Sequence, residues 1–238
     1  MKLDILAFGA HPDDIELSCS GTLLKHISLG YKVGLCDLTQ GELGSRGNRD
    51  IRMKEAEEAR QRMGALIREN LNMEDGFFDL EKNNILKIVM VIRKYKPEII
   101  LANALSDRHP DHGRAAKLVN DSCFFSGLTK IETHFNGTVL DPWRPRAVYH
   151  YVQDRNTDYD FVVDISPYFS KKMELILTFG SQFNAEGDDG PATPISSGQF
   201  MRFMESKNRT YGRDIQVEFA EAFKSQRDIG VENLFHLL

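Results

Sequence analysis

Short apolar runs alternate along the chain with longer segments in which apolar residues recur every three or four positions. The short runs predict β-strands, and the longer, helix-periodic segments predict α-helices. The expected strands cover residues 3–8, 32–39, 67–72, 98–104, 146–153 and 161–166. The expected helices cover residues 15–30, 51–64, 84–96, 167–183 and 198–210, with one more entered from the loop that begins at residue 105. This alternation predicts an α/β fold: a Rossmann-like, doubly wound, mostly parallel sheet with helices on both faces.

The breaks between these segments contain residues that end helices. Gly30 stands where a left-handed residue would close a helix, the next helix is expected to stop near Gly64, and Pro97 stands where a further helix must stop. No repeat or linker divides the sequence, so residues 1–238 are predicted to form a single domain. The stretch 184–198 is rich in Gly, Pro and Asp, and we expect either a substrate-side loop or a mobile surface segment there. No regular element is expected after residue 210.

Charge and composition narrow the class of partner. The formal net charge of −5 argues against nucleic acid, which favours basic surfaces. No apolar run approaches the roughly 20 residues that cross a bilayer, and the first residues do not resemble a secretory signal, so we expect a cytoplasmic protein. The three cysteines, Cys19, Cys36 and Cys123, are too few and scattered for a disulfide framework, and we expect them to be buried.

Two short motifs rich in ionisable residues stand directly after predicted strands. The first is "AHPDD" at residues 10–14, and the second is "HPDH" at residues 109–112. In a doubly wound sheet the first and fourth strands commonly lie side by side, and ligands bind in the crevice at their carboxyl ends. The two motifs are therefore predicted to share one site, although nearly 100 positions separate them.

The residue types in these motifs suit a metal centre. His11, Asp14 and His112 supply two imidazoles and one carboxylate, which is a three-ligand set that leaves a position open for water, as catalytic zinc requires. Asp13, next to the ligand Asp14, is a candidate general base on that water. His109 would face the developing oxyanion or the leaving amine as an imidazolium. Asp111 would then hold the His109 ring in place.

Other interpretations of the same residues remain open. Alone, "HPDD" suits a capped helix start and "HPDH" suits a polar turn. Asp37 stands where an acidic residue meets a ribose in dinucleotide-binding proteins, but the required G-x-G-x-x-G is absent. Two histidines and a carboxylate also form the facial triad of non-haem iron oxygenases. A non-catalytic sugar-binding protein with a structural metal is a further alternative. The remaining histidines are expected to be structural: His26, His134, His150 and His236.

The sequence resembles the LmbE-like, or PIG-L-type, zinc deacetylases, which remove acetyl groups from N-acetylglucosamine derivatives. The segments that carry the resemblance are "ILAFGAHPDDIELSCSGTL", "DLTQGELGSRG", "IRMKEAEEA", "YKPEIILA", "DRHPDHGRAAKLV" and "SQF…TPISSG". Within this family the chain looks most similar to the N-acetylglucosaminyl-malate deacetylases of bacillithiol biosynthesis. The alternative substrates are another N-acetylglucosamine conjugate or a chitooligosaccharide.

The resemblance implies a role for each residue at a matching position. It makes His11, Asp14 and His112 the zinc ligands, Asp13 the base, His109 the electrostatic stabiliser supported by Asp111, and Arg52 a substrate-binding residue. Zinc is the implied cofactor, and Fe²⁺ could occupy the same ligands in the cell. The resemblance also implies a homo-oligomer, often a hexamer. After "TPISSG" some relatives place a tyrosine that reaches the oxyanion, whereas this chain has Gln199 and Phe200, so that role is left open.

Overall fold

The central sheet of this computed structural model, which describes residues 1–183, 191 and 193–237, has seven strands in the order β3-β2-β1-β4-β7-β9-β8. Their bounds, in that order, are Ile67–Met73, Val33–Thr39, Ile5–Gly9, Ile99–Ala102, Ala147–Tyr151, Ala220–Ser225 and Phe161–Asp164. Neighbouring strands from β3 to β7 are parallel, and β9 is antiparallel to both of its neighbours. The predicted adjacency of the first and fourth strands is confirmed, since Ile5, Leu6 and Ala7 pair with Ile99, Ile100 and Leu101.

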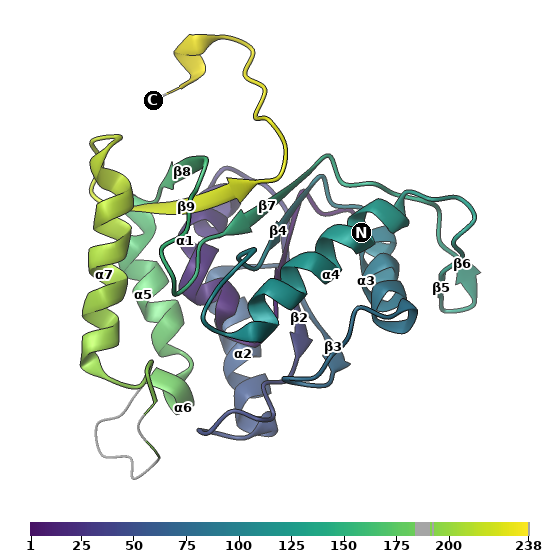
Figure 1. Cartoon of the computed structure of the whole chain (residues 1–238), viewed down its shortest axis with the longest axis horizontal. Helices are drawn as coiled ribbons and strands as arrows, with labels where there is room; N and C mark the ends of the chain where they lie inside the picture. The colour runs from purple at the N-terminus through teal and green to yellow at the C-terminus, as the bar shows by residue number, and fades with distance from the viewer. Residues whose placement is uncertain (184–190, 192, 238) are drawn as a thin grey trace.

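Helices cover both faces of this sheet, so the predicted α/β class is confirmed (Figure 1). Their bounds are α1 Asp14–Ser28, α2 Arg49–Met63, α3 Lys82–Tyr95, α4 Pro110–Ser126, α5 Phe169–Leu177, α6 Gly180–Phe183 and α7 Gly198–Arg213. Short 3₁₀ turns, η1 and η2, cover Ser166–Tyr168 and Leu234–His236. Among the described residues no helix combines the length and the apolar character that a bilayer crossing requires.

The alternation of side chains along β1 explains the two layers of helices. Leu6 and Phe8 lie on one face, in a core with residues of α3 and α4. Ile5 and Ala7 lie on the other face, in a core with residues of α1, α2 and α5. Because side chains of a strand point alternately to opposite faces, a strand buried on both faces has a continuous apolar sequence, as this strand has. The three cysteines are free and buried, as predicted.

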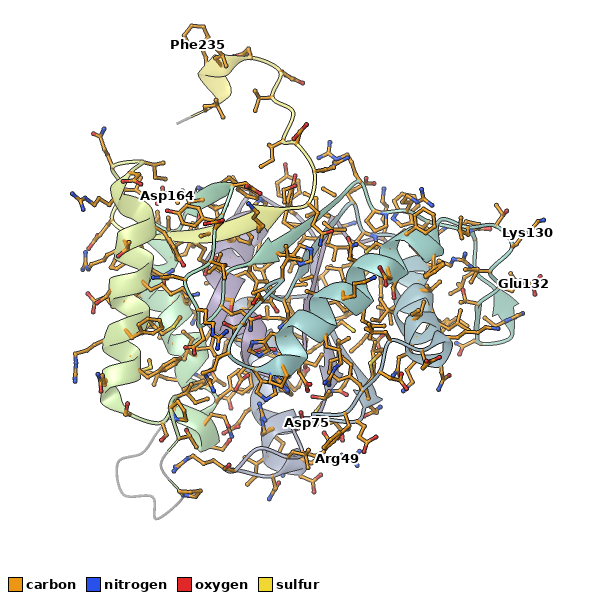
Figure 2. The ribbon with its side chains drawn as sticks, viewed as in Figure 1. Arg49, Asp75, Lys130, Glu132, Asp164 and Phe235 are labelled. Atoms are coloured by element: carbon orange, nitrogen blue, oxygen red, sulfur yellow. The ribbon has the colours of Figure 1, made fainter. Side chains whose placement is uncertain are left out.

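The chain after α7 differs from the prediction. Residues 220–225 form β9, which lies inside the sheet between β7 and β8, where no regular element was expected. A small antiparallel hairpin, β5 His134–Phe135 with β6 Thr138–Val139, was also not predicted. Beyond β9 the chain leaves the sheet, and Phe235 near its end is 96% exposed (Figure 2). The predicted loop at 184–198 falls largely outside the described residues, at 184–190 and 192.

Candidate metal centre

The first motif forms a tight turn between β1 and α1. The amide N–H of His11 donates to Asp14 Oδ2 at 2.9 Å, which closes the turn at the first residue of the helix. Gly9 allows this close approach, since a Cβ there would lie 3.0 Å from the carbonyl oxygen of His11 and 3.3 Å from Asp14 Cβ. Asp13, between the two ligand candidates, has a φ of 128°, a strained conformation for a residue with a side chain. Such strain is typical of functional sites.

The motif is more than a helix cap. Asp13 is the N-cap residue of α1, but its side chain forms no capping hydrogen bond within the described part of the chain. The second motif does begin its helix in the expected way: His109 is the N-cap of α4, Pro110 follows it, and His109 Nδ1 accepts from the Asp111 N–H at 3.2 Å. Both motifs therefore start helices, and in the first motif the Asp13 carboxylate makes no hydrogen bond that caps the helix.

Asp14 lies between the two predicted ligand histidines. Its Oδ1 is 3.1 Å from His112 Nε2, and its Oδ2 is 3.6 Å from His11 Nδ1. The centroids of the two imidazole rings are 5.6 Å apart. The topology thus brings His11, Asp14 and His112 together, as the sequence predicted for the ends of β1 and β4. All three side chains are buried.

A carboxylate lies behind each of these histidines. His112 Nδ1 is 2.6 Å from Asp107 Oδ2, on the ring edge opposite Asp14. His11 Nε2 is 3.0 Å from Asp75 Oδ1 and 3.4 Å from Asp111 Oδ2. Metal-ligating histidines commonly donate their second N–H to a carboxylate, which fixes the tautomer and the ring orientation. These contacts leave Nδ1 of His11 and Nε2 of His112 facing Asp14.

Two amides fix the Asp14 carboxylate. Asn103 Nδ2 donates to Oδ2 at 3.0 Å, and Gln153 Nε2 donates to Oδ1 at 3.1 Å. Gln153 Oε1 in turn accepts from Asn103 Nδ2 at 3.1 Å and from the Ala104 N–H at 3.0 Å. Since Asn103 follows β4 and Gln153 follows β7, the ends of two strands orient this single carboxylate.

Arg52 holds the neighbouring Asp13. Its Nη2 lies 3.2 Å from Asp13 Oδ2 and 2.8 Å from the Pro12 carbonyl, and its Nη1 donates to the Gly41 carbonyl at 3.0 Å. The sequence predicted a substrate-binding role for Arg52, whereas the hydrogen bonds of the buried guanidinium go to the chain itself. Burial raises the pKa of Asp13 to about 7, Arg52 opposes the rise, and the Asp14 carboxylate adds to it.

His109 completes the group of imidazoles, but Asp111 does not orient its ring as predicted. The His109 ring centroid is 4.7 Å from that of His11 and 5.3 Å from that of His112. The Asp111 carboxylate instead accepts from the Gly76 N–H at 2.8 Å and from Arg114 Nη1 at 2.6 Å. The reason is that only the backbone N–H of Asp111 reaches His109, at the helix cap. Burial and the charges of the two other histidines lower the pKa of His109.

Glu16, the remaining acid of the first motif, serves the fold. Its carboxylate pairs with Arg68 at 2.6 Å, and the same guanidinium pairs with Asp37 at 2.7 Å. Burial raises the pKa of Asp37, and Arg68 opposes that rise. Asp37 is therefore committed to a buried ion pair, which agrees with the absence of a dinucleotide motif.

The donor set fits a divalent metal ion. Two groups of described residues place possible ligand atoms within 4.8 Å of one another, namely His11, His109 and His112, and His11, Asp75 and Asp111. Imidazoles with carboxylates suit Zn²⁺ and other divalent transition metals, and carboxylates that accept from the outer ring nitrogens are usual around such ions. The set predicted from the sequence uses two members of the first group together with Asp14.

A cavity of about 340 Å³ is lined in part by these residues. Its lining includes the ionisable residues His11, Asp13, Asp14, His109 and His112, together with Leu17, Leu43, Arg108, Asp154, Ile195, Phe200, Phe203, Met204 and Lys207. Gln199, considered as a substitute for a tyrosine, is exposed on the first turn of α7, while the adjacent Phe200 is buried and lines the cavity. Pockets of this size hold small organic ligands.

Four residues of the site were not predicted from the sequence: Asp75, Asn103, Asp107 and Gln153. Asp75, labelled in Figure 2, follows β3 by two positions. Asn103 directly follows β4, and Gln153 lies two positions after β7. Asp107 lies in the loop between β4 and α4, two positions before His109. The other three share one signal, which is a polar residue within two positions of the carboxyl end of a strand. That signal is available in the sequence, but it is weak without a motif around it.

Comparison with known proteins identifies the family. Residues 6–123 match the PIG-L family, described as GlcNAc-PI de-N-acetylase. The chain is 33% identical over 114 residues to the uncharacterized deacetylase YaiS of Escherichia coli K12, covering 45% of this chain and 61% of that one. It is 26% identical over 179 residues to the mycothiol S-conjugate amidase of Streptomyces coelicolor, covering 63% of this chain and 60% of that one. The matches thus span about three fifths of these two relatives.

A solved structure extends the similarity to the whole fold. The conserved protein TT1542 from Thermus thermophilus is 30% identical, with a TM-score of 0.86, over 98% of each chain. The match to the family covers both histidine motifs, together with the strands and helices that position them. The chain belongs to the PIG-L, or LmbE-like, family.

Proposed function

We propose that this chain is a metal-dependent hydrolase that removes the acetyl group from an N-acetylglucosaminyl small molecule. The observation that carries the proposal is the Asp14 carboxylate between His11 and His112, with a further carboxylate behind each ring. Asp13 lies directly beside this group and lines the same cavity. A metal-ligand set next to a buried, positioned carboxylate is what hydrolysis of an amide requires.

We assign the metal to His11, Asp14 and His112, with zinc as the preferred ion and Fe²⁺ as the alternative. When bound, such an ion polarises the amide carbonyl and lowers the pKa of a bound water. The inward nitrogens of both histidines face Asp14, and their outward nitrogens face Asp75, Asp111 and Asp107, which supports this assignment. Asn103 and Gln153 keep the Asp14 oxygens in position.

Asp13 is the proposed general base and acid. Its carboxylate takes the proton of the attacking water and later gives it to the departing amine nitrogen, so the carboxylate is regenerated in each cycle. Arg52 holds Asp13 through Nη2 and prevents it from turning away. The guanidinium also spans Pro12 and Gly41, which ties the strained turn to the loop after β2.

His109 is the proposed donor to the carbonyl oxygen as negative charge develops there. Because Nδ1 accepts the Asp111 N–H, the neutral ring carries its proton on Nε2. The ring can therefore donate a hydrogen bond without being an imidazolium, which modifies the role expected from the sequence. A fixed donor of this kind stabilises the transition state more than the ground state.

N-acetylglucosaminyl malate is the proposed substrate, and another N-acetylglucosamine conjugate or a chitooligosaccharide is the alternative. The test is acetate release by the zinc-loaded protein from N-acetylglucosaminyl malate, methyl N-acetylglucosaminide and N,N′-diacetylchitobiose. We expect turnover, fastest with the malate conjugate and equal with and without oxygen. Absence of acetate release from all three would contradict the hydrolase, and dependence on oxygen would favour an oxygenase.

We further propose that the protein is a homo-oligomer, with a hexamer expected from the family resemblance. Light scattering of the purified protein measures its mass against the 27.1 kDa of one chain. A monomeric mass at micromolar concentration would contradict this expectation.

A further inference from the structure

Helix α7 forms one wall of the cavity. Phe200, Phe203, Met204 and Lys207 all line it, and their spacing of three, four and seven positions places them on one face of the helix. Phe200 and Met204 are buried against the rest of the fold, which fixes the helix in place. The wall is therefore apolar along most of its length and carries one cation, Lys207.

The arginines that line this cavity have carboxylate partners. Arg52 pairs with Asp13 at 3.2 Å, and Arg108 pairs with Asp154 at 2.7 Å. Lys207 differs from both, because its ammonium donates to the Val152 carbonyl at 3.3 Å and has no carboxylate partner among the described residues. An ammonium can donate three hydrogen bonds, so Lys207 retains capacity for a ligand.

The position of Lys207 is tied to the metal centre through three consecutive residues. The Val152 carbonyl holds Lys207, the Gln153 side chain bonds Asp14, and the Asp154 carboxylate holds Arg108. These residues leave the carboxyl end of β7 as one segment. Asp14 and Lys207 also line the same cavity, so a substrate whose amide lies at Asp14 shares that cavity with the Lys207 ammonium.

We propose that Lys207 is a specificity-determining residue that binds a carboxylate group on the substrate of this site. This inference rests on the proposed function, since it names the chemical class of the group attached to the amino sugar. An anionic group would pair with the lining cation that has no carboxylate partner in the described part of the chain. The Phe203 ring has its centroid 6.0 Å from Lys207 Nζ. This ring would lie beside the sugar, which connects the amide to the carboxylate group.

The electrostatics of Lys207 agree with this role. Burial lowers the pKa of Lys207 to about 8, Lys172 adds to the lowering, and Asp107, Asp154 and Glu221 oppose it. Burial without a close partner disfavours the charged form of an amine. A carboxylate in contact would favour that form again, so ligand and lysine would stabilise each other.

The test is calorimetric binding of glucosaminyl malate, the deacetylated product, and of its neutral dimethyl ester to the zinc-loaded protein. Neither ligand carries an acetyl group, so binding is measured without turnover. We expect the original protein to bind the diacid more tightly than the ester. In Lys207→Met the affinity for the diacid should fall about 10- to 100-fold, and the affinity for the ester should change less than about threefold. Lys207→Arg keeps the charge and should retain the preference. Lys171→Met, at a partly exposed lysine of α5 that pairs with Glu174, is the matched control and should behave as the original protein.

Two results would overturn the inference. One is equal affinity of the original protein for the diacid and the ester. The other is a decrease in affinity in Lys207→Met that is the same for the diacid and for the ester. The acetate-release assay measures turnover, and the calorimetric experiment measures binding, so each can succeed or fail without the other. A Lys207-dependent preference for the diacid in a protein that releases no acetate would support the binding residue and contradict the hydrolase.

Discussion

Asp107 Oδ2 lies 2.6 Å from Nδ1 of His112, on the ring edge opposite the one that faces Asp14. Asp107 is itself held by the Arg155 N–H, which donates to its other oxygen at 2.8 Å. The His112 ring is thus fixed from behind by a residue five positions earlier in the chain. A carboxylate at this place makes the imidazole a stronger and better oriented ligand.

Replacing Asp107 should therefore weaken metal binding without removing a ligand. We expect Asp107→Ala to lower zinc affinity about 10- to 100-fold, as is usual when such outer carboxylates are lost. Competition with a chromogenic chelator measures the affinity. Asp121→Ala, at an aspartate of α4 that pairs with Lys117, is the control and should bind zinc normally. Unchanged affinity in Asp107→Ala would show that His112 is not a ligand or needs no support.

Asp14 should be the ligand whose loss removes the metal. We expect Asp14→Ala to retain little or no zinc after dialysis, because the carboxylate contacts both His11 and His112. Its removal also leaves the donors of Asn103 and Gln153 without this acceptor. Elemental analysis of the purified variant measures the zinc content. Full zinc occupancy would require a different ligand set, such as His11, His109 and His112.

Asp13 should be needed for turnover and not for metal. In Asp13→Ala we expect normal zinc content and a kcat lower by about 10²- to 10⁴-fold, the usual contribution of a positioned general base. Steady-state acetate release, with elemental analysis of the same sample, separates the two effects. Near-normal turnover in this variant would assign the proton transfer to another group.

Arg52 distinguishes positioning from substrate binding. Since its guanidinium contacts Asp13, Pro12 and Gly41, we expect Arg52→Met to lower kcat about tenfold or more and to change KM little. The fall should be similar for the malate conjugate and for neutral methyl N-acetylglucosaminide. A rise in KM confined to the anionic substrate would instead support the role that the sequence predicted for Arg52.

The buried pair Lys172–Glu221 predicts a large effect on stability. Both side chains are fully buried, their charged atoms are 2.6 Å apart, and Glu221 also accepts from the N–H groups of Gly21 and Thr22. We expect Lys172→Met to lower the free energy of unfolding by about 3–5 kcal/mol, because the buried Glu221 carboxylate loses its charged partner. Urea titration measures this. The partly exposed Lys171→Met should stay within about 0.5 kcal/mol of the original protein.

The same pair explains why the sequence did not reveal β9. The strand reads Ala-Glu-Ala-Phe-Lys-Ser, and Glu221 in its interior is 1% exposed. A buried charge breaks the apolar pattern that identifies an internal strand, and its partner Lys172 lies 49 positions earlier. The more uniformly apolar strands β1 and β4 had no such charge, and the sequence located both of them.

The candidate metal ligands could be predicted because their surroundings in the sequence are regular. His11, Asp14 and His112 belong to compact motifs at the ends of recognisable strands, so topology alone brought them together. Asp75 is a single residue in a loop, with no motif to mark it. The direction of the Arg52 side chain depends on how α2 docks on the sheet, and this docking cannot be deduced from helical periodicity.

The pairing of β1 with β4 also has a thermodynamic consequence. His11 and His112 approach each other only when these strands are hydrogen-bonded, so the unfolded chain offers no comparable group of donors. An ion that binds the native state alone shifts the folding equilibrium by mass action, by about 2.7 kcal/mol at a concentration about one hundred times its dissociation constant. Zinc should then raise the melting temperature of this protein and slow its proteolysis, and a chelator should reverse both effects.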